Sequence, residues 1–273
     1  MFLYETLTGF FAQDDPLANP VTIGATPPRF GLIDFSEGRW SSLIEKLREL
    51  NGRVGDTSYK LIFFGRHGQG WHNVAEAKYG TQAWDDYWAM LYGDGELTWG
   101  PDPELTDLGK DQASRLNHLW KEELGAAIPP PEKLYCSPMT RAMQTNILTF
   151  EGVSTRRTLV VENCREEYGE HTCDKRNTRT YISDTFPQLD IDGDLTEDDQ
   201  LWEAETRETA AHATARAKTV LDQIFRDDEH ATFLSITAHG GIINGFLHAL
   251  GRPNYLLPTG GVLPVIIKAT KVV

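Results

Sequence analysis

The sequence predicts an α/β protein in which a mostly parallel central sheet lies between two layers of helices, as a three-layer α/β/α sandwich. Short apolar runs of strand length alternate along the chain with longer segments whose apolar residues recur every three to four positions. Strands that alternate with helices usually form a parallel sheet covered on both faces. The chain has 273 residues, 40% of them hydrophobic, which is enough for one domain with a large core.

Residues 1–57 are expected to form an N-terminal arm that packs on the main domain, residues 58–273. Several prolines and glycines in the arm indicate extended backbone. Within it, Trp40, Leu43 and Leu47 have the spacing of one amphipathic helix. This helix either covers the sheet, which we favour, or serves as a lid over the pocket or as a dimer arm.

The apolar run at residues 61–64 predicts a buried strand that stops at Arg66, His67 and Gly68. Glycine allows the backbone to turn tightly and to approach a ligand closely. Helical residues resume at Asn73, so the loop ends at the N-terminus of a helix, where an anion is favoured. Strand, loop and helix together predict an anion site.

The remaining elements follow in order. Residues 81–92 are dense in aromatic side chains, which either line a substrate pocket or form a local aromatic core, the interpretation we favour. Thr106 is expected to cap a helix, and the polar residues 175–200 predict a loop. Residues 262–268 are expected to form an edge strand that tolerates Pro264. The other predicted strands are 133–137, 158–162 and 232–237, and the other predicted helices carry residues 141, 213–224 and 240–250.

Composition excludes several classes of partner. The net charge of −14 and the isoelectric point near 5.0 argue against a nucleic acid or an anionic membrane as partner. Three cysteines without metal-ligand spacing indicate neither a disulfide framework nor a metal site. No signal peptide and no apolar run of about 20 residues is found, so we expect a cytoplasmic protein, with the nucleus as the alternative. The oligomeric state is left open.

Five polar residues each follow the carboxyl end of a predicted strand or begin the helix after it. They are Arg66, His67, Arg141, Glu166 and His239. In an open parallel sheet the carboxyl ends of the strands share one edge, so residues far apart in the sequence can converge there. Two arginines beside two histidines would give an acidic protein a local basic pocket for an anionic substrate.

Four segments in this order resemble the signature segments of the histidine phosphatase superfamily, the group that includes cofactor-dependent phosphoglycerate mutases. They are Arg-His-Gly with Asn73 in residues 66–73, and residues 137–145, 165–169 and 237–241. Residues 68–73 and 171–176 further resemble the fungal and plant branch of mutase-like phosphatases. The resemblance extends from about Arg29 onward and implies a phosphoglycerate-mutase-like fold.

The resemblance implies a metal-independent phosphatase that needs no cofactor and hydrolyses a small phosphate monoester. His67 would attack phosphorus and form a phosphohistidine that water later cleaves. Arg66 and Arg141 would bind the phosphoryl oxygens, and their charge would keep His67 unprotonated. His239 would stabilise the charge of the transition state.

The leaving oxygen requires a proton donor, which the pattern assigns to Glu166. The adjacent Glu167 is the alternative, because only one of two neighbouring residues should point to the phosphate. Further substrate-binding residues implied by the resemblance are Gly68, Asn73, Gly240 and His171.

Two rival functions belong to different classes. A mutase would return the phosphoryl group to its substrate instead of passing it to water. A binding or scaffold protein would keep the fold but lack turnover, although such proteins typically lose a core residue, and Arg66, His67, Arg141 and His239 are all present. The sequence does not identify the substrate, because this fold serves many phosphate esters.

Overall fold

Seven strands form one sheet in the order β1-β7-β2-β6-β3-β4-β5 in the computed structural model, which describes residues 1–53 and 55–272. Strands β2, β6, β3, β4 and β5 run parallel, whereas β7 runs antiparallel to both of its neighbours. The predicted mostly parallel sheet is therefore confirmed. The strands are β1 (Phe2–Leu7), β2 (Thr57–Arg66), β3 (Lys133–Cys136), β4 (Leu159–Val160), β5 (Asp190–Ile191), β6 (Phe233–Ala238) and β7 (Val262–Lys271).

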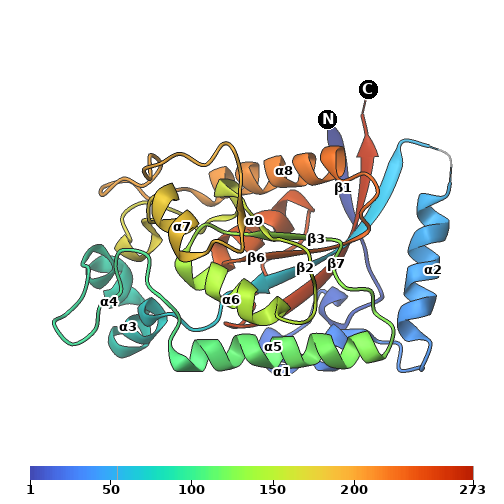
Figure 1. Cartoon of the computed structure of the whole chain (residues 1–273), viewed down its shortest axis with the longest axis horizontal. Helices are drawn as coiled ribbons and strands as arrows, with labels where there is room; N and C mark the ends of the chain where they lie inside the picture. The colour runs from blue at the N-terminus through green and yellow to red at the C-terminus, as the bar shows by residue number, and fades with distance from the viewer. Residues whose placement is uncertain (54, 273) are drawn as a thin grey trace.

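Helices cover both faces of this sheet. Figure 1 shows α8 on one side of the strands and α5 on the other, with α3 and α4 beyond one end of the sheet. The helices are α1 (Pro20–Ile23), α2 (Arg39–Asn51), α3 (Trp71–Tyr79), α4 (Thr81–Asp86), α5 (Asp107–Gly125), α6 (Thr140–Phe150), α7 (Arg179–Thr185), α8 (Ala210–Asp227) and α9 (Gly240–Ala249). In the described part of the chain, none of these helices has the length and apolar character needed to cross a bilayer.

The core is divided by the alternation of side chains along β2. Leu61 and Phe63 point to the side of α2 and α5, where they pack with Trp40 and Trp120. Ile62 and Phe64 point to the opposite side, against α8 and α9. Because strand side chains alternate between faces, one continuous apolar run supplies both halves of the core. The amphipathic helix predicted in the N-terminal arm is thus confirmed as α2, and it covers the sheet.

The N-terminal arm also contributes β1, a strand that the sequence analysis did not predict. β1 pairs with β7, so the expectation that residues 262–268 form an edge strand is wrong. Pro264 is tolerated because it lies in the part of β7 that does not pair with β1. The pairing of β1 with β7 ends at Leu7 and Ile266, so Pro264 lies beyond β1 and its missing N–H deprives no β1 carbonyl of a donor.

Two further segments can be compared with their predictions. In the aromatic segment, Trp84 is buried in a small cluster with Trp99 and with Trp88 packed against it, which confirms a local aromatic core. Residues 175–200 are not one loop, because they contain α7 and β5. Thr178 caps α7, and Ile182 of that helix is fully buried in a cluster with Phe186 and Leu189, so a few apolar residues in a polar stretch anchor the helix.

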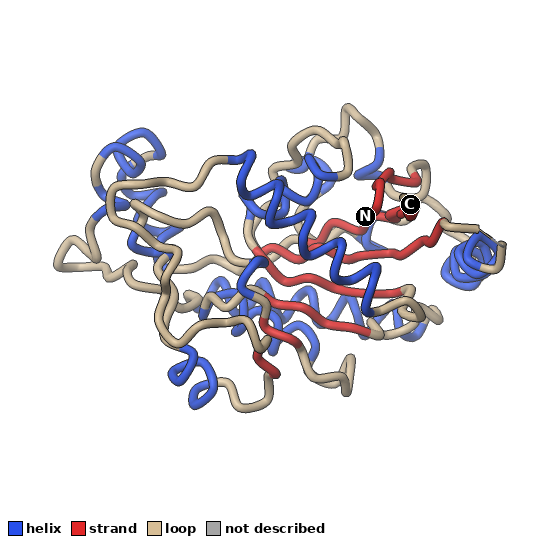
Figure 2. The backbone as a smooth tube through the Cα atoms, turned by 90° about the horizontal axis from the view of Figure 1, so that it is seen from above, coloured by secondary structure: helices blue, strands red, loops and turns tan. Residues whose placement is uncertain are grey.

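The carboxyl ends of the parallel strands determine where the site lies. Figure 2 shows long loops gathered beyond one end of the strands. β2, β6 and β3 are neighbours in the sheet, and the loops that follow them leave from the same edge. Thr106 caps α5 by accepting a hydrogen bond from Gly109 N–H, as predicted, and the start of α5 contacts the loop after β2.

Candidate active site

The residues that follow three neighbouring strands meet at this edge of the sheet. His67 follows β2, His239 follows β6, and Ser137 follows β3. The ring centroids of His67 and His239 lie 4.9 Å apart. Both histidines are buried, with exposed fractions of 2% and 0%. The convergence that the sheet topology predicted is therefore observed for the two histidines.

His67 is held in one tautomer by the backbone. Its Nδ1 lies 2.7 Å from the carbonyl oxygen of Gly68, and a carbonyl can only accept, so Nδ1 carries the hydrogen. The lone pair is then on Nε2. Burial lowers the pKa of His67 well below its usual range, and the charges of Arg141 and Arg66 lower it further. His67 is thus a neutral imidazole with a nucleophilic nitrogen available.

Arg66 and Arg141 are fixed by hydrogen bonds to the backbone. Arg66 donates to the carbonyl oxygen of Leu257 at 2.8 Å. Arg141 donates to the carbonyl oxygen of Cys173 and to the carboxylate of Asp174, each at 2.8 Å. The Nε atoms of both arginines are buried and find no hydrogen-bond partner among the described residues. Each guanidinium therefore retains donor capacity for an anion.

His239 also has a buried nitrogen without a hydrogen-bond partner among the described residues. Its Nε2 lies 2.7 Å from the hydroxyl oxygen of Ser137, while its Nδ1 is buried and without a partner in the described part of the protein. Burial lowers the pKa of His239 well below its usual range, and Arg141 and His67 lower it further. Buried nitrogens are normally hydrogen-bonded, so unpaired nitrogens on Arg66, Arg141 and His239 mark a place that receives an acceptor group.

The two glutamates occupy different environments at the N-terminus of α9. The carboxylate of Glu166 accepts hydrogen bonds from the backbone N–H groups of Gly241 and Ile242, at 3.1 and 3.0 Å. These two bonds fix the position of the Glu166 carboxylate at the start of α9. Glu167 is half-buried, and burial followed by the charge of Glu166 raises the pKa of its carboxyl group.

The four residues predicted to bind substrate have different positions. The carbonyl oxygen of the Asn73 side chain accepts from Gly70 N–H at 3.0 Å, which closes the loop at the start of α3. Gly68 N–H donates to the hydroxyl of Thr145. A Cβ atom on Gly240 would lie 3.6 Å from the guanidinium carbon of Arg66, so Gly240 borders the arginine.

His171, the fourth predicted substrate-binding residue, lies at the margin of the site. Its Nε2 is 3.8 Å from Asp85 Oδ1, and its side chain is 14% exposed. It also forms a group with Cys173 and Asp174 whose potential ligand atoms lie within 4.8 Å of one another. Asp174 is already bound to Arg141 and Arg207, and two guanidinium groups repel a cation. We therefore assign no metal to this group.

Sequence reasoning missed several residues that the structure brings to the site. Ser137 bonds His239, and Thr145 bonds Gly68 in residues 67–70, the loop after β2 that we call the catalytic loop. Both lie in a segment that resembled the family. Asp174 positions Arg141. His72, which the sequence analysis did not name as a site residue, has its ring centroid 5.3 Å from that of His67. Its position one residue before Asn73 was the signal available in the sequence.

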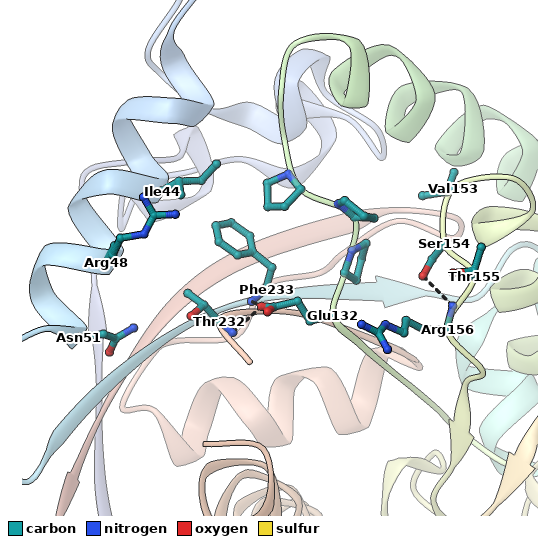
Figure 3. A pocket seen from close by; sticks show the side chains of 13 residues that line it. Ile44, Arg48, Asn51, Glu132, Val153, Ser154, Thr155, Arg156, Thr232 and Phe233 are labelled. Carbon is teal, nitrogen blue, oxygen red and sulfur yellow. Dashed lines mark hydrogen bonds between the residues drawn. The ribbon is translucent and has the colours of Figure 1, made fainter. Parts of the chain in front are cut away.

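A cavity of about 750 Å³ lies elsewhere (Figure 3). Its lining includes Glu132 and Thr232, which precede β3 and β6, so it opens at the amino edge of the sheet, opposite the histidines. At this cavity the carboxylate of Glu132 accepts hydrogen bonds from the backbone N–H groups of Thr232 and Phe233, as the figure shows. This cavity contains none of the catalytic candidates.

A mostly parallel α/β sheet with two buried histidines and two arginines at its carboxyl edge has the donors that suit an anionic group such as a phosphoryl group. The profile of the histidine phosphatase superfamily (branch 1) matches residues 90–259. A probable phosphoglycerate mutase of Arthroderma benhamiae is 41% identical, over 97% of this chain and 84% of the relative. The chain therefore belongs to the histidine phosphatase superfamily.

Other relatives agree with this placement. The probable phosphoglycerate mutase PMU1 of Saccharomyces cerevisiae is 35% identical, over 77% of this chain and 79% of the relative. The ecdysone phosphate phosphatase of Bombix mori, solved with tungstate, has the same fold, with a TM-score of 0.50 and 15% identity over 75% of this chain and 88% of that one. Family membership and the names of the relatives support phosphatase or mutase-type activity.

Proposed function

We propose that this protein is a phosphatase that hydrolyses a small phosphate monoester without a metal, through a phosphohistidine on His67. The observation that supports this best is the hydrogen bond from His67 Nδ1 to the carbonyl oxygen of Gly68, which leaves Nε2 free to attack. A covalent intermediate divides one difficult displacement into two easier ones. The carbonyl of Gly68 would also stabilise the positive charge on the phosphorylated ring.

The reaction has two steps. In the first, a bond forms between His67 Nε2 and phosphorus while the ester P–O bond breaks, and the leaving oxygen takes a proton from Glu166. In the second, water attacks phosphorus and gives a proton back to Glu166, and the N–P bond breaks to release inorganic phosphate. Arg66, Arg141 and His239 neutralise the charge on the phosphoryl oxygens in both transition states.

Glu167 is a second candidate for the proton donor. Its raised pKa is the property that a general acid needs, whereas the carboxylate of Glu166 already accepts two backbone hydrogen bonds at the N-terminus of α9. Glu166 remains our assignment because it has the position of the acid in the family pattern. Replacing each by glutamine separates them, since loss of the true acid should slow an alkyl phosphate far more than p-nitrophenyl phosphate, whose leaving group needs no proton.

The experiment that tests the proposal is hydrolysis of p-nitrophenyl phosphate, with EDTA present, by the wild type and by His67→Ala. We expect wild-type turnover and a loss of at least about a thousandfold in kcat for the variant. His248→Ala is the control, because the side chain of His248 is exposed on α9 and is hydrogen-bonded to Asn254. Retained hydrolysis by His67→Ala, or wild-type activity abolished by EDTA, would contradict the mechanism.

Mutase activity is the second candidate function, because the relatives from Arthroderma benhamiae and Saccharomyces cerevisiae are both named probable phosphoglycerate mutases. Phosphorus NMR of the protein with 3-phosphoglycerate distinguishes the two. A phosphatase releases inorganic phosphate, whereas a mutase yields 2-phosphoglycerate at constant total ester.

We further propose that the protein works in a reducing compartment, the cytoplasm or the nucleus. Cys136, Cys164 and Cys173 are buried free thiols, and burial raises the pKa of each thiol. Unreactive buried thiols suit such a compartment.

A further inference from the structure

His72 is a buried histidine next to the proposed nucleophile that the mechanism above does not use. It lies in the first turn of α3, and its exposed fraction is 9%. Its ring centroid is 5.3 Å from that of His67, and the rings are inclined at 53°. Burial, followed by the charge of Arg141, lowers the pKa of His72 well below its usual range, so the ring is neutral. A neutral imidazole has one hydrogen to donate.

The Nδ1 atom of His72 has the same unusual property as three proposed phosphate ligands. It is buried and finds no hydrogen-bond partner among the described residues, like Nδ1 of His239 and Nε of Arg66 and Arg141. An unsatisfied buried polar atom is costly, and native proteins contain few of them. Four such nitrogens at one edge of the sheet point to a shared acceptor rather than to four separate defects.

The backbone makes room for this ring. A Cβ atom on Gly70 would lie 2.8 Å from His72 Nδ1, so a side chain at position 70 would displace the ring. Gly70 N–H already donates to the side chain of Asn73, so it is not a hydrogen-bond partner of His72 Nδ1. If the ring served only to fill space, a purely apolar side chain would do so without an unpaired nitrogen.

We propose that His72 is a fourth ligand of the phosphoryl group and donates a hydrogen bond from Nδ1 to one of its oxygens. The proposal rests on the proposed function, because it needs the phosphoryl group to bind beside His67. It assigns a direct role to a residue outside the set formed by Arg66, Arg141 and His239.

Calorimetry with inorganic phosphate tests this assignment on the wild type, His72→Phe and His72→Gln, together with hydrolysis of p-nitrophenyl phosphate. Phenylalanine keeps the ring shape but has no donor, whereas glutamine keeps an N–H donor. We expect His72→Phe to weaken phosphate binding by about tenfold or more, with a smaller loss in His72→Gln. His248→Gln is the matched control and should bind phosphate like the wild type.

Each other outcome overturns the proposal in a recognisable way. If His72→Phe binds phosphate like the wild type while the wild type hydrolyses the ester, His72 is not a ligand and the phosphatase assignment stands. Equal loss in both variants means that the ring acts by packing. If the wild type neither binds phosphate nor hydrolyses the ester, both proposals fail. Should His72→Phe not fold, His72→Leu replaces it, because leucine also lacks a donor: weakened phosphate binding supports the proposal, and wild-type affinity overturns it.

Discussion

At the scale of single residues, the carboxylate of Asp174 is shared by two arginines. Oδ1 accepts from Arg141 and Oδ2 from Arg207, each at 2.8 Å. Burial alone would raise the pKa of Asp174, but the two arginines hold it below its ordinary value. Asp174 is thus a positioning residue, since it fixes the guanidinium that is proposed to bind phosphate.

Replacing Asp174 with asparagine should therefore damage both stability and catalysis. The change leaves two guanidinium groups without their carboxylate, and breaking a buried ion pair costs about 3–5 kcal/mol. Because Arg141 loses its orientation, we expect kcat/KM to fall by at least about tenfold. Chemical denaturation and steady-state kinetics measure the two effects.

Asp190→Asn is the control for Asp174→Asn. Its partner is Arg157, and both side chains are about half exposed, with fractions of 53% and 52%. An exposed ion pair contributes little, so the free energy of unfolding should change by less than about 1 kcal/mol and kcat/KM should not change. Unchanged kinetics in folded Asp174→Asn would show that Arg141 does not depend on Asp174.

The candidate site could be predicted residue by residue only in part. Arg66, His67 and His239 were found because each follows an apolar run of strand length, where the ends of parallel strands share one edge, and because their segments resemble the signature of the histidine phosphatase superfamily. Asp174 and His72 were not, because their importance depends on what they contact after folding. No local periodicity distinguishes a carboxylate that orients a distant arginine from one on the surface.

At the scale of elements, the catalytic loop and α5 approach each other through two glycines. A Cβ atom on Gly68 would lie 2.2 Å from the carbonyl oxygen of Gly109, and one on Gly109 would lie 2.2 Å from that of Gln69. Contacts this short are not possible, so any side chain at either position must separate the loop from the helix. The loop that carries His67 is therefore positioned by the start of α5.

Gly109→Ala should lower both stability and activity. Alanine normally stabilises a helix by about 0.5–1 kcal/mol relative to glycine, but here its methyl group must displace the loop backbone. We expect the free energy of unfolding to fall by about 1–3 kcal/mol, with a larger relative loss in kcat. Circular dichroism with denaturant and hydrolysis kinetics check the result.

Gly125→Ala lies in the same helix and is its matched control. Nothing lies within 4 Å of a Cβ atom built at Gly125, so this variant should be neutral or slightly stabilised. If both variants behaved alike, the close approach at Gly109 would not constrain the loop.

Elements were predicted most reliably where the chain carries a long periodic pattern, as in α2, α5 and α8. β1, α7 and β5 were missed because they are short and depend on neighbours. β1 is held by pairing with β7, and β5 has only two residues against β4. Pairing between distant segments is not recorded in local composition, which also explains why β7 was wrongly placed at an edge.

At the scale of the whole molecule, Lys60 of the central strand β2 is hydrogen-bonded to the turn between α8 and β6. Its exposed fraction is 1%, and its ammonium donates to the backbone carbonyl oxygens of Asp228 and Ala231. Burial lowers the pKa of Lys60 to about 8. The unfolded chain therefore binds a proton more tightly than the folded protein does.

Stability should consequently depend on pH above about 8. Between that value and the ordinary lysine pKa near 10.5, the unfolded state holds more protons, so the free energy of unfolding rises with pH. Below about pH 8, Lys60 is protonated in both the folded and the unfolded state, so it adds no pH dependence to the free energy of unfolding there. Denaturation of the wild type and of Lys60→Met across pH 7 to 11 measures it, because the difference between the two should rise with pH. A flat difference would contradict the lowered pKa.

The strand order has a consequence for synthesis on the ribosome. β7 is the last strand in the sequence, yet it lies between β1, the first strand, and β2, which leads into the catalytic loop. During translation at about 5–20 residues per second, β1 and β2 must wait for more than half of the chain before their common neighbour emerges. Until then β1 and β2 both present an edge without its β7 partner to other nascent chains, and the sheet that carries the candidate site is incomplete until β7 leaves the exit tunnel.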